Sequence, residues 1–554
     1  MKRSLCIVTL IVLLAFPTLT TAQTTPAYIN WIPADFDGFV RVSMDDPALA
    51  LRRLNFGLFI AASLEWARFP DLSTTPTLDQ YFPLDMLDLE AASFGTNVAP
   101  WLGDEVVIAY RELNAEFQAE QTLMILPTYD SFTSAYRLRS AIQAQDFLQR
   151  DPYRGNIIYV GDQTAIAFTP QAIIIASEAL VQSTIDMMLD GGTALTADPQ
   201  YQQIQAQIAQ EAPISAYITG DAVANALPML LGGDGNAVLS TLGSALGENG
   251  GTFGALLNGQ VTAMGLSFAP DMVSLQEAQA RVVLATDGAA SVALDATVLD
   301  FLPRSAMIVY SGADAATAGD HLLTALPLMT FMPTALSSFG VQPLAGEPLP
   351  LPSSDQITGV IDRFTVALNA AANIDLRADV LAHLDGSYAF AVIPRPNNPI
   401  PLWNMPVELL LIARVDNPAE TVDALLMLVE TFITDRFTRA RSDGNAIFTL
   451  TAPDSDAALV KIGSVDNWLI MGTGESVDAA LAAQRGDNRL TAQARWTALA
   501  ADAPPNVYID LNSYFNTFFP AEGGATQTNF AQMGVYWEAL EGGLFQIDAV
   551  VKLP

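Results

Sequence analysis

Carboxylates are the most abundant side chains in this sequence that could do chemistry, with 59 Asp and Glu among 554 residues. Three pairs lie close together in the chain: Asp104 and Glu105, Asp85 and Asp88, and Asp45 and Asp46. A carboxylate pair in which one pKa is raised is the device of a glycoside hydrolase. Trp101 and Tyr110, which flank Asp104, have the flat aromatic faces that bind sugar rings. However, carboxylates are common at the ends of helices and strands, and each pair stands at such an expected end.

The other reactive side chains are scarce. The two histidines are His321, which follows Asp320 near an expected helix start, and His383, which we interpret as a packing position. Cys6 is the only cysteine, so a transition-metal site is not expected. Motifs for nucleotide binding and for a serine nucleophile are absent. The sequence at 454–456 resembles a calcium loop but lacks its distal glutamate, so calcium at an acidic loop stays open. We therefore assign no catalytic, cofactor-binding or metal-binding residue, and we expect no cofactor.

The chain reads as a tandem duplication. The segment PWLGDEVVIAY at 100–110 pairs with AHLDGSYAFAV at 382–392, and matches in the same order run through most of both halves. Between these two segments the Gly103-Asp104 pair becomes Asp385-Gly386, while the apolar run is kept. A tight turn tolerates such an exchange, because glycine and aspartate both adopt turn geometry readily. We interpret Asp104 as a turn residue at the start of a core strand, with no catalytic role.

Each half alternates strands and helices. Residues 155–178 contain three short apolar runs joined by tight turns, which predicts neighbouring antiparallel strands. Helices are expected after Asp46, after Asp130 and after Asn417, where a capping residue precedes a helical apolar pattern. The predicted fold is α+β: two tandem similar domains, each a largely antiparallel twisted sheet with helices packed on one face. The expected bounds are 1–22 for a signal peptide, 23–290 for the first domain and 291–554 for the second.

The first 22 residues are typical of a secretory signal. Lys2 and Arg3 precede an apolar run, and small residues end at Ala22, which predicts cleavage before Gln23 and a secreted or extracytoplasmic protein. No later apolar run is long enough to span a membrane, so no transmembrane segment is expected after cleavage. The net charge of −34 disfavours nucleic acid and anionic lipid headgroups as partners. An apolar ligand or a protein of the cell envelope stays open as a partner.

Several of these residues also carry a resemblance. The D-P-A helix start at Asp46, W-L-G-D-E at 101–105, Y-D at 129–130, G-N-I-I-Y at 155–159 and A-Y-I at 216–218 resemble a bacterial exported family of unknown function (family 3352). The resemblance implies an extracytoplasmic bacterial protein and carries over no site residue. We expect a non-enzymatic binding or scaffolding module of the cell envelope. The alternatives are a carrier of an apolar ligand such as a lipid, and a carbohydrate-active hydrolase with paired carboxylates.

Overall fold

A computed structural model describes seventeen segments of the chain. They are residues 27–45, 99–113, 119–144, 147–162, 164–208, 212–223, 261–270, 277–286, 294–316, 374–395, 406–432, 440–441, 446–451, 458–500, 503–518, 532–540 and 543–552. The signal peptide, the helix expected after Asp46 and the carboxylates Asp85 and Asp88 lie outside these segments, as does His321.

The described part of the first half, residues 27–286, contains ten strands and three α-helices. The strands are β1 (Gly38–Ser43), β2 (Glu105–Leu113), β3 (Ala119–Pro127), β4 (Leu148–Gln149), β5 (Ile157–Val160), β6 (Ala165–Phe168), β7 (Ala172–Ala176), β8 (Ile214–Thr219), β9 (Val261–Pro270) and β10 (Glu277–Thr286). The helices are α4 (Ser131–Ala144), α5 (Glu178–Asp190) and α6 (Pro199–Gln207).

The described part of the second half, residues 294–552, contains ten strands and four α-helices. The strands are β11 (Ile308–Gly312), β12 (Leu384–Pro394), β13 (Val407–Val415), β14 (Ala440–Arg441), β15 (Ala446–Thr451), β16 (Ala458–Val465), β17 (Trp468–Thr473), β18 (Val507–Asp510), β19 (Gln532–Leu540) and β20 (Leu544–Lys552). The helices are α12 (Pro418–Phe432), α13 (Ser476–Gln484), α14 (Ala494–Leu499) and α15 (Leu511–Phe518).

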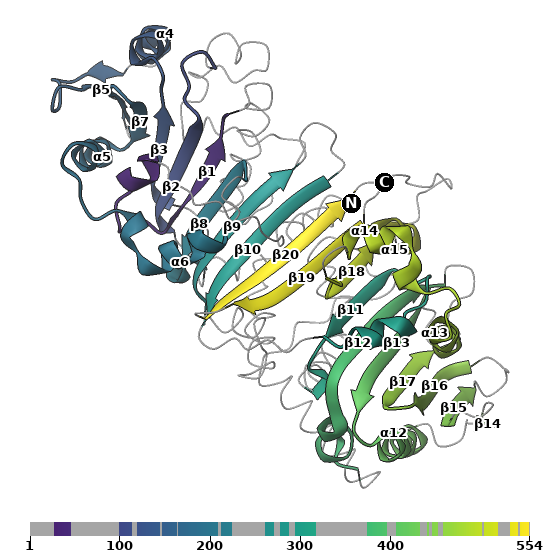
Figure 1. The fold of residues 1–554 in the computed structure, drawn as a ribbon. Coiled ribbons are helices and arrows are strands. Elements are labelled where there is room, and N and C mark those ends of the chain that lie inside the picture. The colour runs from purple at the N-terminus through teal and green to yellow at the C-terminus, as the bar shows by residue number, and fades with distance from the viewer. Residues whose placement is uncertain are drawn as a thin grey trace, which may run out of the picture.

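All twenty strands belong to one antiparallel sheet. The pairings in the first half give the order β4-β5-β6-β7-β3-β2-β1-β8-β9-β10. Those in the second half give β14-β15-β16-β17-β13-β12-β11-β18-β19-β20. The two orders match strand for strand. The halves meet edge to edge where β10 pairs with β20, near the middle of the long sheet (Figure 1).

The predicted antiparallel α+β character is confirmed, together with several of the predicted elements. The three short strands expected in 155–178 are β5, β6 and β7, and they pair with one another in order. The helices expected after Asp130 and Asn417 are α4 and α12. Asp130 caps α4, because its Oδ1 accepts a hydrogen bond of 3.0 Å from the backbone N–H of Thr133.

Helices cover both faces of the sheet, so the prediction of helices on one face is wrong. Alternate residues of a strand point to opposite faces. In β1, Val40 packs in the same apolar cluster as Leu138 of α4, whereas Phe39 packs with Val181 of α5 and Ile204 of α6. We call these faces the α4 side and the α6 side. The apolar pattern of a helix shows that one stripe is buried but does not show against which face.

The second half has the same arrangement. On β20, Phe545 belongs to the α4-side cluster, whereas Leu544 packs on the α6 side. Val550 points to the same side as Leu544 and packs with α13 and α14. The helix α12 packs with Leu469 of β17, whose neighbour Ile470 packs with α13. Therefore α12 lies on the α4 side of the sheet, and α13 and α14 lie on the α6 side.

Candidate functional site

The segment PWLGD at 100–104 forms the support for the start of α4. The backbone N–H of Gly103 donates to the carbonyl of Pro127 over 2.8 Å, and that of Tyr129 donates to the carbonyl of Trp101 over 2.9 Å. Trp101 is fully buried in the α4-side cluster. A Cβ on Gly103 would lie 2.8 Å from the Cβ of Pro127, so this close approach requires glycine. The turn holds the end of β3 and leads directly into β2.

The adjacent acids Asp104 and Glu105 have opposite surroundings. Asp104 is exposed, and its carboxylate accepts a hydrogen bond from the hydroxyl of Tyr129. Glu105 is buried on the α6 side, and its Oε2 lies 2.6 Å from Nε of Arg41 on β1. Burial raises the pKa of Glu105, and Arg41 opposes this rise. The two carboxylates therefore do not face a common cleft as the acid and base of a hydrolase would.

The aromatic side chains expected beside Asp104 do not offer a surface to a sugar. Trp101 and Tyr110 are both buried in the α4-side cluster. Asp45, the described member of another candidate pair, is exposed just beyond β1, and its backbone N–H reaches Oγ of Ser43 over 3.5 Å. Of the described candidate acids, Asp104 contacts an exposed aromatic side chain, Tyr129, but the second carboxylate of its pair, Glu105, is buried away from it.

The buried pair Arg41–Glu105 distinguishes the first half from the second. Phe39 lies opposite Ala109, and Val309 lies opposite Ala391 in the same way. Counting along the strands from these pairs places Ser311 and Ser387 where the first half has Arg41 and Glu105. The fold therefore accepts either a charged pair or two hydroxyl groups at this point.

Two polar atoms of the first half are buried there without a hydrogen-bond partner among the described residues. They are Oε1 of Glu105 and the hydroxyl of Tyr201 on α6. Desolvation raises the pKa of Tyr201 to about 12. A raised pKa of this kind is typical of functional groups but also of groups buried for structural reasons. Glu105 itself is only 5% exposed.

His383 is partly exposed and is oriented by a carboxylate. Its Nδ1 lies 2.8 Å from Oδ1 of Asp416, and the backbone N–H of Asp416 donates to the carbonyl of His383 over 3.0 Å. The contact ties the turn before β12 to the residues that lead into α12. His383 thus links two connecting segments and is not a core packing residue. Among the described residues, no group of His, Cys, Asp and Glu is arranged to hold a metal ion.

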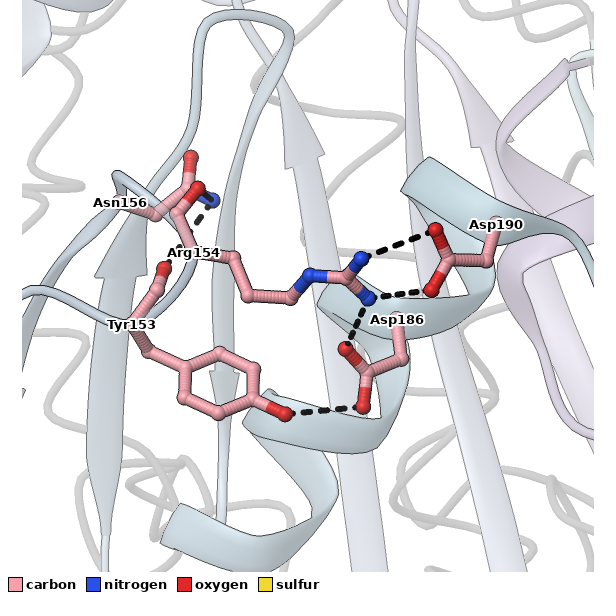
Figure 2. Close-up of polar contacts among 5 residues, drawn as sticks. All are labelled: Tyr153, Arg154, Asn156, Asp186 and Asp190. Carbon is pink, nitrogen blue, oxygen red and sulfur yellow. Dashed lines mark hydrogen bonds and ion pairs between the residues drawn. The ribbon is translucent and has the colours of Figure 1, made fainter.

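An exposed cluster on α5 was not singled out from the sequence (Figure 2). Asp186 and Asp190 are four residues apart on one face of the helix, and both contact the guanidinium of Arg154. The hydroxyl of Tyr153 donates to Asp186 over 2.9 Å. These hydrogen bonds, that of Arg154 first, lower the pKa of Asp186. The cluster links the turn before β5 to α5, and the guanidinium of Arg154 occupies the position between the two carboxylates that a cation would need.

Three aromatic side chains at the start of α4 are the most exposed aromatic residues that the structure describes. Tyr129 is 67% exposed, Phe132 is 80% exposed and Tyr136 is 74% exposed. Phe132 and Tyr136 are four residues apart on α4 and share one face opposite the buried Leu138, and Tyr129 lies just before the helix begins. Arg137 is exposed beside them. We call Tyr129, Phe132 and Tyr136 the aromatic face of α4.

The aromatic face is the strongest candidate site that the structure describes. Exposed aromatic side chains grouped on one element mark interaction surfaces, and Tyr, Phe and Arg are enriched in protein interfaces. Exposed anchors four residues apart on one helix face, such as Phe132 and Tyr136, are also part of the pattern by which a helix docks on a partner. The hydrogen bond from Tyr129 to Asp104 fixes the first of these rings. In the sequence, this exposed surface corresponds to a second stripe of aromatic residues on α4, opposite the buried stripe that contains Leu138.

A buried ion pair joins the two halves on the α6 side. Nε of Arg281 on β10 lies 3.0 Å from Oδ1 of Asp548 on β20, and Nη1 donates to the carbonyl of Gln207 at the end of α6 over 2.8 Å. Nε2 of Gln546 donates to Oδ2 of Asp548 over 2.7 Å. The pair sits where the two halves meet and is enclosed by protein, so its place in the molecule indicates a structural role.

Comparisons with known proteins give a family but no activity. A family model described as "Protein of unknown function (DUF3352)" matches residues 77–533. No curated protein matches. Among solved structures, "Structure of crystal form I of TP0453" is 10% identical with a TM-score of 0.26, covering 49% of this chain and 81% of that one. Crystal form III of TP0453 is 10% identical with a TM-score of 0.25, covering 50% of this chain and 86% of that one. Among the helices of the described segments, none has the length and apolar content needed to cross a membrane.

Proposed function

We propose a function for a chain that belongs to the DUF3352 family of proteins of unknown function: it is a non-enzymatic binding or scaffolding module of the bacterial cell envelope. The observation that carries the proposal is the aromatic face of α4. Burying an aromatic side chain contributes roughly 1.5–3 kcal/mol, so leaving three of them in water has a cost that a partner would recover. We propose that this face is the binding surface.

The surrounding structure supports a scaffold. One antiparallel sheet runs through both halves, and the same strand order in each half supports a tandem duplication of one folding unit. A long sheet covered by helices holds surface helices such as α4 in fixed positions. Export is part of the proposal and follows from the basic and apolar residues before Ala22. Mass spectrometry of the mature protein should find Gln23 at its N-terminus, and a chain that keeps residue 1 would contradict export by this signal.

Co-sedimentation with isolated envelope fragments of the source bacterium tests the function. The wild-type mature chain should co-sediment, and the variant F132S/Y136S should lose most of this binding because both anchors are removed. The control L189S changes an exposed apolar residue on α5, on the other side of the sheet, and should bind as the wild type does. Circular dichroism checks that all three proteins are folded. Full binding by F132S/Y136S, or no binding by the wild type, would refute the proposal.

A further inference from the structure

The strands β10 and β20, which lie side by side in the middle of the sheet, occupy equivalent places in the two halves (Figure 1). Stepping across the sheet from Phe39 in the first half and from Val309 in the second passes a tyrosine, then a glycine, then a valine. In the first half these residues are Tyr217, Gly265 and Val283. In the second half they are Tyr508, Gly534 and Val550. The valine on β10 is therefore equivalent to the valine on β20.

Arg281 and Asp548 are equivalent to each other and are also partners. They lie two residues before Val283 and Val550, and they stand directly opposite each other where β10 pairs with β20. The pairs on either side are exchanged about this point, with a valine opposite a glutamine in both: Val283 with Gln546, and Val550 with Gln279. A pseudo-two-fold axis between the halves thus passes between Arg281 and Asp548. We call it the junction axis.

A residue on a two-fold axis faces its own counterpart, so the charges at the junction axis distinguish like halves from unlike halves. Two first halves joined through β10 would place one Arg281 against another, and two second halves would place Asp548 against Asp548. Arg281 is 3% exposed and Asp548 is 4% exposed, so either pair of like charges would be buried and would repel strongly. A first half joined to a second half brings opposite charges together, with Nε of Arg281 3.0 Å from Oδ1 of Asp548.

The other residues of the two strands do not make this distinction. Arg281 is the only charged residue between 278 and 284 on β10, and Asp548 is the only one between 545 and 551 on β20. The backbone hydrogen bonds of an antiparallel pair form whatever the side chains are. Without the two charges, each strand would offer a long apolar edge to the same strand of another copy.

We propose that the pair of Arg281 and Asp548 selects the partner of each central strand: β10 accepts β20 and rejects the β10 of another copy, and β20 rejects another β20. The pair thereby prevents like halves of two chains from joining through their central strands. A buried ion pair often adds little net stability compared with two apolar side chains, but like-charge repulsion excludes wrong partners. The proposal goes beyond the binding function proposed above and does not depend on it.

Urea unfolding of three charge variants tests whether the junction axis requires opposite charges. R281D places two carboxylates at the axis and D548R places two guanidinium groups there, so both variants should unfold at lower urea concentrations than the wild type. The exchange R281D/D548R restores opposite charges at two equivalent positions. It should unfold at a higher urea concentration than either single variant. If the two side chains acted only through other contacts, such as that of Arg281 with the carbonyl of Gln207, the exchange would combine both losses and be the least stable.

Refolding from urea tests the rejection of like halves. R281M/D548L removes both charges from the junction axis, so it should refold into a larger fraction of dimers and higher assemblies than the wild type. The matched control R41M/E105L removes a buried ion pair that lies within the first half, away from the junction, and should refold with the wild-type distribution. R281D/D548R should do so as well. Size-exclusion chromatography with light scattering measures the fractions, and circular dichroism checks that each refolded variant is folded.

Two results would overturn the proposal. One is an exchange variant R281D/D548R that unfolds at no higher urea concentration than R281D and D548R. The other is an R281M/D548L variant that refolds into no larger fraction of assemblies than R41M/E105L.

Discussion

The buried pair of Arg281 and Asp548 should control the stability of the junction between the halves, and D548A is the direct perturbation. Removing Asp548 leaves the Arg281 guanidinium buried without the carboxylate that lies 3.0 Å from its Nε. The nearby carbonyl of Gln207 accepts only one of its hydrogen bonds. Breaking a buried ion pair by removing one partner costs about 3–5 kcal/mol of unfolding free energy. We expect a loss in this range.

The double variant R281M/D548L separates the charge from the packing. Replacing both members of a buried pair with apolar residues is often neutral or stabilising by about 1–4 kcal/mol. Here the change also leaves the Gln546 amide and the Gln207 carbonyl without these partners, at about 1–3 kcal/mol for each. The two groups together cost about 2–6 kcal/mol, so the central values leave a net loss of about 2 kcal/mol. The double variant should therefore be more stable than D548A, which also leaves the Gln546 amide without this partner, although it carries one more substitution.

Urea unfolding followed by tryptophan fluorescence and by circular dichroism provides the assay. Coincident transitions from the two probes are required before one free energy is assigned. The control is D300A, which removes the exposed partner of Arg489, and an exposed pair should contribute less than about 1 kcal/mol. The reasoning is refuted if D548A is destabilised no more than D300A. It is also refuted if R281M/D548L is less stable than D548A.

Three further changes test other parts of the structure. The pKa of Glu105 is raised in the folded protein, so Glu105 stabilises the fold most below its unfolded-state pKa, and this contribution declines as pH rises from the unfolded-state pKa to the folded-state pKa. The urea midpoint should therefore fall more between pH 4.5 and pH 7 for the wild type than for E105Q. Equal slopes of the urea midpoint against pH would contradict this prediction. G265A should destabilise the protein by about 1–3 kcal/mol in urea unfolding, because the new Cβ would lie 2.2 Å from Cγ2 of Ile204 on α6. Arg154 has a φ of 50°, so R154G should melt at a higher temperature than R154A, which keeps the backbone strain and loses the same contacts; a lower melting temperature for R154G would show that the strain is unimportant.

Local features of the fold were predictable because their signals lie within a few residues. The strands β5, β6 and β7 follow from apolar runs separated by tight turns, and α4 follows from Asp130 before a helical pattern. The opposite surroundings of Asp104 and Glu105 also had a local signal. Glu105 shares the α6 side with Val107 and Ala109 by strand alternation, whereas Asp104 belongs to the turn.

Long-range features were not predictable in the same way. The pairing of β10 with β20 brings together Arg281 and Asp548, which are 267 residues apart. A charged residue within an apolar strand indicates a buried partner but does not identify it. The choice of sheet face for each helix likewise depends on the connections between elements, and helical periodicity does not encode these. The aromatic face of α4 was not predicted because its residues carry no reactive group, and sequence alone does not show which side chains of a helix are exposed.

The two outermost strands of the sheet have a consequence for how the protein behaves when it is concentrated. The described sheet ends at β4 on one side and at β14 on the other, and each is only two residues long. A long exposed edge would offer a row of unpaired backbone groups on which another chain could add a strand. With such short edges, this very wide sheet offers little template for fibril growth. Contacts between copies at high concentration should then involve side chains and not the pairing of strand edges.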